Sequence, residues 1–292
     1  MRKLIDVSSY NGTVSWEKAK AYGCQGAILK IIRKDLKIDN GFNRNYQACN
    51  ENEIAWGVYN YSYATTAAKA KSDMKLVCDI LDKIDKEHFE YGIWFDLEDK
   101  VQASLSKAKI AEIINAAQEV VEIRGYVFGV YTGKSYYEEH IDRKQIKCQN
   151  WWIARYYQGD KRMQIATNPN QEKKPAAANI AWQYTSNGRF PQVISTGNSG
   201  NFDLNVLYKE PVAKKGEDDK ETTTKAKVTY YPRYRGKSSS IVDALKSLKI
   251  NSSQKNREKI AALNSIKNYK GTASQNTKLL NLLKRGKLIK SK

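Results

Sequence analysis

Histidine is the scarcest potential catalytic residue in this chain of 292 residues, which contains only His88 and His140. The two lie far apart and form no HExxH pattern, so the sequence predicts no zinc hydrolase site, because such sites usually need two or three histidine ligands. The cysteines form no CxxC pair, which argues against a zinc knuckle or a redox motif. They are Cys24, Cys49, Cys78 and Cys148. We expect reduced thiols, no metal and no other cofactor.

Long apolar runs are also missing. No stretch of about 18 apolar residues occurs, so we expect no membrane-spanning helix and no membrane insertion. Met1–Lys3 leads directly into the strand-like Leu4–Val7 with no apolar signal region, so we expect a mature protein without a signal peptide. The 41% hydrophobic and 11% aromatic residues suffice for a globular core and exclude a disordered or collagen-like chain.

Acidic residues are scarce only at the C-terminal end. Residues 1–208 contain 28 basic and 24 acidic residues, a net charge of +4. Residues 228–292 contain 16 basic and 2 acidic residues, a net charge of +14 out of +19 for the whole chain. The segment 209–227 mixes charges with Pro, Gly and Thr and predicts a flexible linker. The sequence thus predicts a domain over 1–208 and a small one over 228–292. The charge of the second indicates an anionic partner, such as nucleic acid, a membrane surface or an acidic polymer.

The first domain alternates between strand-like and helix-like segments. Helical patterns cover Ser15–Tyr22, Phe42–Asn52, Thr66–Lys86 and Leu105–Arg124. This alternation predicts parallel strands joined by right-handed crossovers, closed into an irregular α/β barrel of the TIM type with eight strands and about five helices. The expected strands are Lys3–Ser8, Gly26–Ile32, Ala55–Tyr63, Tyr91–Leu97, Tyr126–Tyr131, Trp151–Tyr156, Ile180–Tyr184 and Phe202–Val206.

Four carboxylates fall in or directly after these strands. Asp6 lies in the first, Asp96 and Glu98 end the fourth, and Asp203 lies in the last, which would close against the first. Catalytic groups of parallel barrels lie at the carboxyl ends of the strands. Alternation along a strand points Asp96 and Glu98 the same way, with Cβ atoms roughly 6–7 Å apart.

The pair Asp96 and Glu98 predicts acid–base chemistry. Mutual repulsion and burial should raise one pKa and leave a protonated acid beside a carboxylate, which is what glycoside hydrolysis needs. The alternative is a strand end whose acids are simply solvated. Tyrosine and tryptophan at the same barrel end could stack on sugar rings, and Gln183 could orient substrate amides. The candidate substrate-binding residues are Tyr10, Tyr59, Tyr61, Tyr131, Trp152, Trp182 and Gln183.

Seven motifs follow one another in order across residues 1 to 208. They are Asp6–Gly12, Trp16, Gly57–Tyr61, Phe95–Glu98, Trp152–Tyr156, Trp182–Tyr184 and Phe202–Asp203. This ordered set resembles the glycoside hydrolase family 25 lysozymes, N-acetylmuramidases that include many bacteriophage endolysins. The resemblance implies cleavage of the β-1,4 bond from N-acetylmuramic acid to N-acetylglucosamine in bacterial peptidoglycan.

Transferred to this chain, the resemblance implies a role for each acid. Glu98 would be the general acid, and Asp96 would stabilise the reaction centre, for example by orienting the substrate's N-acetyl group. Asp6 and Asp203 would flank the subsite and tune the acid, and no metal is implied. An endolysin without a signal peptide would stay in the host cytoplasm until a separate pore-forming protein releases it. The chain departs from the common pattern at Asn60, where many relatives carry histidine.

Residues 228–292 show three amphipathic helical patterns and predict a small, basic, all-α module. It is similar, more loosely, to wall-binding modules of endolysins from phages of clostridia, which implies peptidoglycan or an anionic wall polymer as its ligand. Tyr231, Tyr234 and Tyr269 are candidate sugar-contacting residues.

Three alternatives stay open at this point. The charge of residues 228–292 fits nucleic acid equally well, although no recognisable DNA- or RNA-binding motif occurs. A wall-binding protein with a non-catalytic barrel is disfavoured by the presence of all four acids. A chitinase-type N-acetylglucosaminidase would share the barrel, but its DxxDxDxE signature is absent.

Overall fold

The computed structural model describes residues 1–197, 200–212, 229–264, 266, 269–286 and 288–290. The chain divides into two compact units, residues 1–215 and 216–292. Residues 213–227 of the predicted linker lie outside the described residues. No helix in the described part of the chain is long and apolar enough to cross a bilayer.

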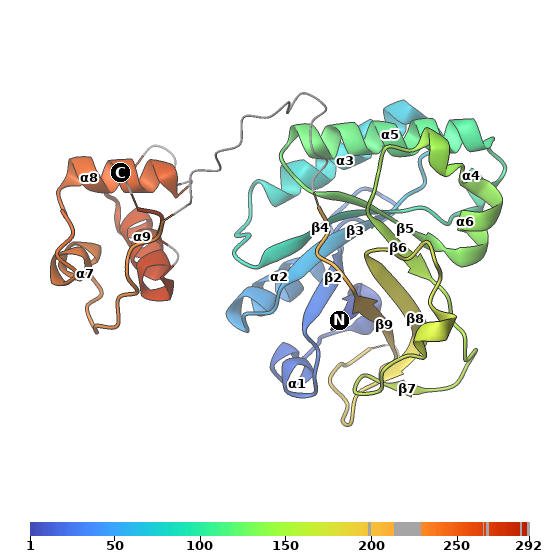
Figure 1. Ribbon diagram of the computed structural model, residues 1–292, viewed down its shortest axis with the longest axis horizontal. Coiled ribbons are helices and arrows are strands. Elements are labelled where there is room, and N and C mark those ends of the chain that lie inside the picture. The colour runs from blue at the N-terminus through green and yellow to red at the C-terminus, as the bar shows by residue number, and fades with distance from the viewer. Residues whose placement is uncertain (198–199, 213–228, 265, 267–268, 287, 291–292) are drawn as a thin grey trace. The chain divides into compact units, whose positions relative to one another are not determined.

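The first unit is built around a closed sheet (Figure 1). Strands β1 to β6 follow one another in order, β8 pairs with β6, and β9 pairs with both β8 and β1, so eight strands close a ring. The predicted eight-stranded barrel is confirmed, and each strand overlaps its expected segment. The strands are β1 (Arg2–Val7), β2 (Gly26–Lys30), β3 (Trp56–Tyr61), β4 (Phe89–Asp96), β5 (Phe128–Gly133), β6 (Trp151–Ala154), β7 (Met163–Gln164), β8 (Ala181–Arg189) and β9 (Phe202–Leu207).

Two features of the sheet differ from the prediction. The short strand β7, which pairs with the far part of β8, was not expected. Strand β9 runs antiparallel to β8 and β1, so the expectation of parallel strands was wrong for this strand. The described part of the connection between Arg189 and Phe202 contains no helix that would carry the chain back along the barrel. The start of β9 therefore lies at the barrel end where the parallel strands finish.

Helices surround the sheet, and α3 packs along α5 (Figure 1). The side chains of Thr66 and Ser106 cap α3 and α5 by accepting hydrogen bonds from backbone N–H groups of the first turn. The four helical predictions correspond to α1, α2, α3 and α5, and α4 and α6 are short additions. The α-helices are α1 (Trp16–Ala21), α2 (Phe42–Glu51), α3 (Ala67–Leu81), α4 (Lys100–Ala103), α5 (Lys107–Ile123) and α6 (Lys134–His140), and the 3-10 turns are η1 (Ser9–Asn11), η2 (Arg143–Gln145) and η3 (Gln171–Lys173).

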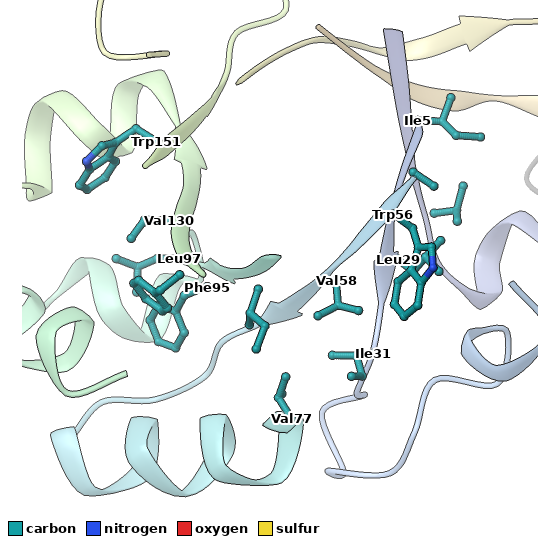
Figure 2. Packing of buried hydrophobic residues seen from close by; sticks show 14 of the residues in the cluster. Ile5, Leu29, Ile31, Trp56, Val58, Val77, Phe95, Leu97, Val130 and Trp151 are labelled. Atoms are coloured by element: carbon teal, nitrogen blue, oxygen red, sulfur yellow. The ribbon is translucent and has the colours of Figure 1, made fainter. Parts of the chain in front are cut away.

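Alternation along the strands separates two apolar layers. Residues on the outer face, such as Leu29 of β2, Val58 of β3 and Phe95 of β4, join the core between the sheet and its helices. Figure 2 shows this layer, with Val77 of α3 pointing toward the strands. All four cysteines are buried and form no disulfide in the structure.

The inner face fills the barrel with large side chains. Trp94 and Trp152 meet edge to face there, with ring centroids 5.7 Å apart. Gly129 makes room for them, because a Cβ at this position would lie 2.4 Å from the Trp94 ring. This apolar plug leaves the polar residues of the inner face gathered near the barrel end where the parallel strands finish.

The second unit contains three helices in its described part, as predicted: α7 (Ile241–Ser247), α8 (Gln254–Leu263) and α9 (Ala273–Arg285). Thr272 and Gln275 form a capping box at the start of α9, and Gly286 ends the helix in the left-handed conformation. An isolated antiparallel bridge joins Tyr230 to Ile289. Buried leucine, isoleucine and tyrosine side chains form the core of this unit.

Candidate active site

The structure brings the four predicted carboxylates to one end of the barrel. Asp6 lies near the end of β1, Asp96 is the last residue of β4, and Glu98 follows two residues later. Asp203 lies near the start of β9 and is the direct partner of Asp6 in the antiparallel register. The reversed direction of β9 thus leaves the site complete, since its first residues adjoin the ends of the parallel strands.

Asp6 is the hydrogen-bonded centre of this group. Its Oδ2 accepts from Asn205 Nδ2 at 2.7 Å and from Gln183 Nε2 at 2.9 Å. Asn205 is held in turn by Trp152, whose Nε1 donates to Asn205 Oδ1 at 2.9 Å. Both amides are buried, so these bonds fix the orientation of the Asp6 carboxylate.

Two tyrosines hold Gln183 in place. The hydroxyl groups of Tyr131 and Tyr156 donate to Gln183 Oε1 at 2.8 Å and 2.6 Å. The oxygen of this amide is therefore saturated by donors, and its nitrogen must point toward Asp6. Tyr131 is buried, whereas Tyr156 is 43% exposed and connects the network to the surface.

Asp6 and Asp203 act as a coupled acid pair. Burial raises the pKa of Asp6 from 3.8 to about 6, while hydrogen bonds from Asn205, Gln183 and Asp203 hold it down. Burial, the charge of Asp6 and the hydrogen bond to Asp6 raise the pKa of Asp203 well above its ordinary value. A hydrogen bond joins the two carboxyl groups, so the pair shares a proton and titrates as a unit.

Asp96 lies in a different environment, with far fewer hydrogen bonds. It is 4% exposed, and its Oδ1 has no hydrogen-bond partner among the described residues. Burial and the charge of Glu98 raise its pKa well above 3.8, and the cation of Lys30 partly offsets this rise. Lys30 Nζ lies 5.8 Å and 5.6 Å from the ring centroids of Tyr59 and Tyr61, within cation–π range.

Glu98 is the acid with access to solvent. Its side chain is exposed at the barrel rim, just beyond the end of β4. Partial desolvation raises its pKa, and the charges of Asp6 and Asp99 raise it further. A carboxyl group with a raised pKa keeps its proton to a higher pH than an ordinary glutamate, and its exposure allows it to deliver that proton to a bound molecule.

Three of the candidate substrate residues lie near these acids or at the rim. Burial and the charges of Asp6, Asp96 and Asp203 raise the pKa of Tyr59, so its hydroxyl stays protonated. Tyr61 donates a hydrogen bond to Asp99 at 3.2 Å. Tyr10, in η1, is 79% exposed and offers its ring to solvent.

Trp152 and Trp182, which the sequence predicted to stack on sugar rings, are both buried instead. Trp152 is 2% exposed inside the barrel and supports Asn205. Trp182 lies on the opposite face of β8 from Gln183, in the core outside the barrel, and its Nε1 donates to the backbone of Arg155. The structure therefore does not bring Trp182 into the polar group around Asp6.

The three tyrosines predicted to contact sugars in the second unit are core residues. Tyr231, Tyr234 and Tyr269 are each less than 10% exposed and pack with Leu279 and Leu283. Their rings leave little surface for stacking on a ligand.

Asn205, Lys30 and Tyr156 belong to the site but were not predicted. A usable signal existed for two of them, because Asn205 is two residues from Asp203 and Lys30 is two residues from the inward-facing Ile28. Tyr156 follows β6 in a loop, although the sequence predicted a strand that extended to this residue. No group of three or more His, Cys, Asp or Glu is arranged to hold a metal ion in the part of the chain that the structure describes.

Known proteins share this architecture. The modular autolysin LytC of Streptococcus pneumoniae, in a complex with a synthetic peptidoglycan ligand, has a TM-score of 0.56 and 25% identity over 71% of this chain and 46% of its own. The catalytic domain of endolysin ply40, from phage P40 of Listeria monocytogenes, has a TM-score of 0.56 and 19% identity. The match covers 71% of this chain and 93% of the ply40 domain. By sequence, the uncharacterised protein YegX of Escherichia coli O157:H7 is 23% identical over 70% of this chain and 68% of its own length.

The chain spans less than half of the length of the pneumococcal autolysin that it matches. The model of the glycosyl hydrolases family 25 matches residues 5–193, which is most of the barrel and includes Asp6, Asp96 and Glu98. This chain is a glycoside hydrolase and belongs to the glycosyl hydrolases family 25.

Proposed function

We propose that the barrel hydrolyses the β-1,4 bond between N-acetylmuramic acid and N-acetylglucosamine in bacterial peptidoglycan. The observation that carries this proposal is the group of four interacting carboxylates, of which three are at least half-buried and one, Glu98, is exposed. The synthetic peptidoglycan ligand in the autolysin complex supports the choice of polymer. The naming of ply40 as an endolysin supports a bacteriolytic role.

In this proposal Glu98 is the general acid. Its raised pKa favours the protonated form of the carboxyl group, and its exposure lets it reach the glycosidic oxygen of a bound chain. Protonation of the leaving oxygen during cleavage of the C–O bond is one of the two tasks of a glycosidase carboxyl pair.

Asp96 performs the second task beside the sugar that develops positive charge. Its buried oxygen, which has no partner in the part of the chain that the structure describes, is suited to accept a hydrogen bond from the N-acetyl group of the substrate or to stabilise the oxocarbenium-like centre. The negative charge of Asp6 acts on Glu98, and Asp203 shares a proton with Asp6, so this pair tunes the acid from the opposite wall. Tyr10, Tyr59, Tyr61 and Tyr131 are proposed to line the substrate path.

The second unit is proposed to hold the enzyme on the wall. Its net charge of +14 over residues 228–292 favours binding to an anionic wall polymer by long-range attraction. Under this proposal the barrel hydrolyses peptidoglycan, and the second unit binds the enzyme to the cell wall.

Product analysis tests the bond that is cleaved. Purified walls digested with the enzyme should yield muropeptides whose new reducing ends, labelled by borohydride reduction, are on muramic acid in mass spectra. A digest with the Glu98→Gln variant is the matched blank. New reducing ends on glucosamine would instead establish the chitinase-type specificity, and no new reducing ends would establish a non-catalytic barrel.

A further inference from the structure

The second unit contains a pocket with a volume of about 460 Å³, lined by Arg233, Tyr234, Arg235, Gly236 and Lys284. Four of these residues precede α7, and Lys284 lies in the last turn of α9. Three of the five lining side chains are cationic and none is acidic. The pocket therefore concentrates positive charge that elsewhere in this unit is spread over the surface.

The walls of the pocket are fixed to the end of α9. The backbone N–H of Tyr234 donates to the carbonyl of Leu283 at 3.0 Å, and Arg233 Nε donates to the carbonyl of Lys284 at 2.8 Å. The N–H of Tyr231 donates to the carbonyl of Leu288 at 2.8 Å. These bonds position the basic segment before any ligand arrives, which reduces the entropy lost on binding.

Tyr234 and Gly236 lie against each other in the lining of the pocket. The Tyr234 ring is buried, and its hydroxyl accepts a hydrogen bond from the N–H of Ser238 at 3.2 Å. A Cβ on Gly236 would lie only 2.3 Å from that hydroxyl oxygen, so glycine is required for this close approach. Tyr234 thus shapes the pocket, although it does not present a face for stacking.

The cations of the pocket are not neutralised by the protein. Among the described residues, no carboxylate forms an ion pair with Arg233, Arg235 or Lys284. Arg257 of α8 contrasts with them, since its Nε donates to the Tyr269 hydroxyl and its Nη1 to a backbone carbonyl. That arginine supports the fold, whereas the pocket cations are available to an external anion.

We propose that this pocket binds a phosphate group of a phosphodiester-linked wall polymer, an inference that rests on the proposed wall-targeting function. Two guanidinium groups and one ammonium supply more positive charge and more N–H donors than a single carboxylate requires, and they match a phosphate with several acceptor oxygens. The volume accommodates the phosphate together with an adjoining polyol or sugar residue. Binding here places the polymer at the junction of the basic segment and α9.

Two matched double variants of the full chain test the pocket. Arg235→Gln with Lys284→Gln removes two pocket cations and keeps Arg233, whose hydrogen bond anchors the segment. Lys246→Gln with Lys255→Gln removes the same charge from exposed positions outside the pocket. The probes are poly(glycerol phosphate), duplex DNA, and purified Gram-positive walls before and after hydrofluoric acid, which cleaves phosphodiesters.

The pocket variant should bind poly(glycerol phosphate) and untreated walls roughly a hundredfold more weakly, because each of the two lost charged hydrogen bonds contributes about a factor of ten or more. The control variant should lose about twofold or less, and wild-type protein should bind treated walls as weakly as the pocket variant binds untreated ones. Three results would each overturn the proposal. The first is an equal loss of affinity in the two variants, and the second is wild-type wall binding that hydrofluoric acid leaves unchanged. The third is tighter wild-type binding to duplex DNA than to poly(glycerol phosphate).

Product analysis on the treated walls separates this inference from the proposed function. Muramic acid reducing ends from both double variants, together with equal binding losses, would overturn only the pocket. If the wild-type protein produced no such ends, the proposed function would fail whatever the variants bind.

Discussion

The two sides of the candidate active site hold their acids in opposite ways. On the side of β1, β8 and β9, Asp6 accepts two amide hydrogen bonds and shares a proton with Asp203. On the side of β4, Asp96 is equally buried, but one of its oxygens has no partner among the described residues. A buried carboxylate oxygen without a donor is costly to the fold and marks a place where substrate is expected to supply the missing interaction.

Under the proposed function, this difference separates the residues that we expect to react from those that we expect to support them. The amide-bound side is rigid and satisfied, so its role is to set the electrostatics of the site. The β4 side combines the unsatisfied Asp96 with the exposed Glu98, so we place the chemistry there. Changes on the two sides should therefore alter activity and stability in different proportions.

The largest expected effect follows from Glu98→Gln. The amide cannot donate a proton to the leaving oxygen, so the rate of wall lysis should fall roughly 10³-fold, within the range for loss of a general acid. The melting temperature should not fall, because the side chain is exposed at the rim. Turbidity loss of wall suspensions and thermal unfolding measure the two quantities.

Glu17→Gln is the matched control for this change, because Glu17 is an exposed glutamate on α1. It should lyse walls at the wild-type rate. A Glu98→Gln variant that retained more than about a tenth of wild-type activity would refute the assignment of the acid.

Asp96→Asn should separate activity from stability. Activity should fall by roughly a hundredfold, because the negative charge beside the reacting sugar is lost. Stability should rise, since burial raises the pKa of Asp96 well above 3.8 and the native state therefore resists its ionisation.

The sign of the pH dependence follows from this shift. The native pKa of Asp96 exceeds the unfolded one, so this carboxyl group destabilises the wild-type protein increasingly as pH rises above about 4, and Asp96→Asn removes that contribution. The variant should match the wild type near pH 4 and melt at a higher temperature at neutral pH. Equal melting temperatures across this range would show that Asp96 is compensated by the fold, contrary to the comparison of the two sides.

Much of the site could be predicted because the period of a strand is two. Asp96 follows Trp94 on the inner face, and Asp6 follows Leu4, so each acid falls at the end of an inward-facing series. The same rule is sufficient to exclude Trp182 from the substrate-binding residues. Two adjacent residues of a strand face opposite sides, and Gln183 is the one that faces the site.

Other features could not be predicted from a local pattern. The direction of β9 depends on how the chain returns after β8, which no periodicity encodes. Tyrosine in the second unit was expected to contact sugar, but its amphipathic ring serves a small core equally well, as the buried Tyr234 and Tyr269 show. The pocket before α7 depends on contacts between Arg233 and α9, far apart in the chain.

The smallest expected effect on activity comes from the satisfied side, through Asn205→Ala. This change removes a donor from Asp6 and leaves the Trp152 N–H without its acceptor, which should destabilise the fold by about 1–3 kcal/mol. Activity should fall by roughly tenfold or less, because no reacting group is lost. Lysis assays measure the activity, and thermal unfolding measures the stability. Gln183→Ala, which removes the other amide donor to Asp6, should also lower both activity and stability.

The pH dependence identifies Asp6 as the group through which Asn205 acts. The hydrogen bond from Asn205 lowers the pKa of Asp6, which stands at about 6, so its removal should raise that pKa further. Because the native pKa then exceeds the unfolded value of 3.8 by more, the added instability should grow as pH rises from 4 to above 6. A stability loss that is the same at pH 4 and pH 7 would indicate that Asn205 serves only the packing around Trp152, and the electrostatic role of the satisfied side would be rejected.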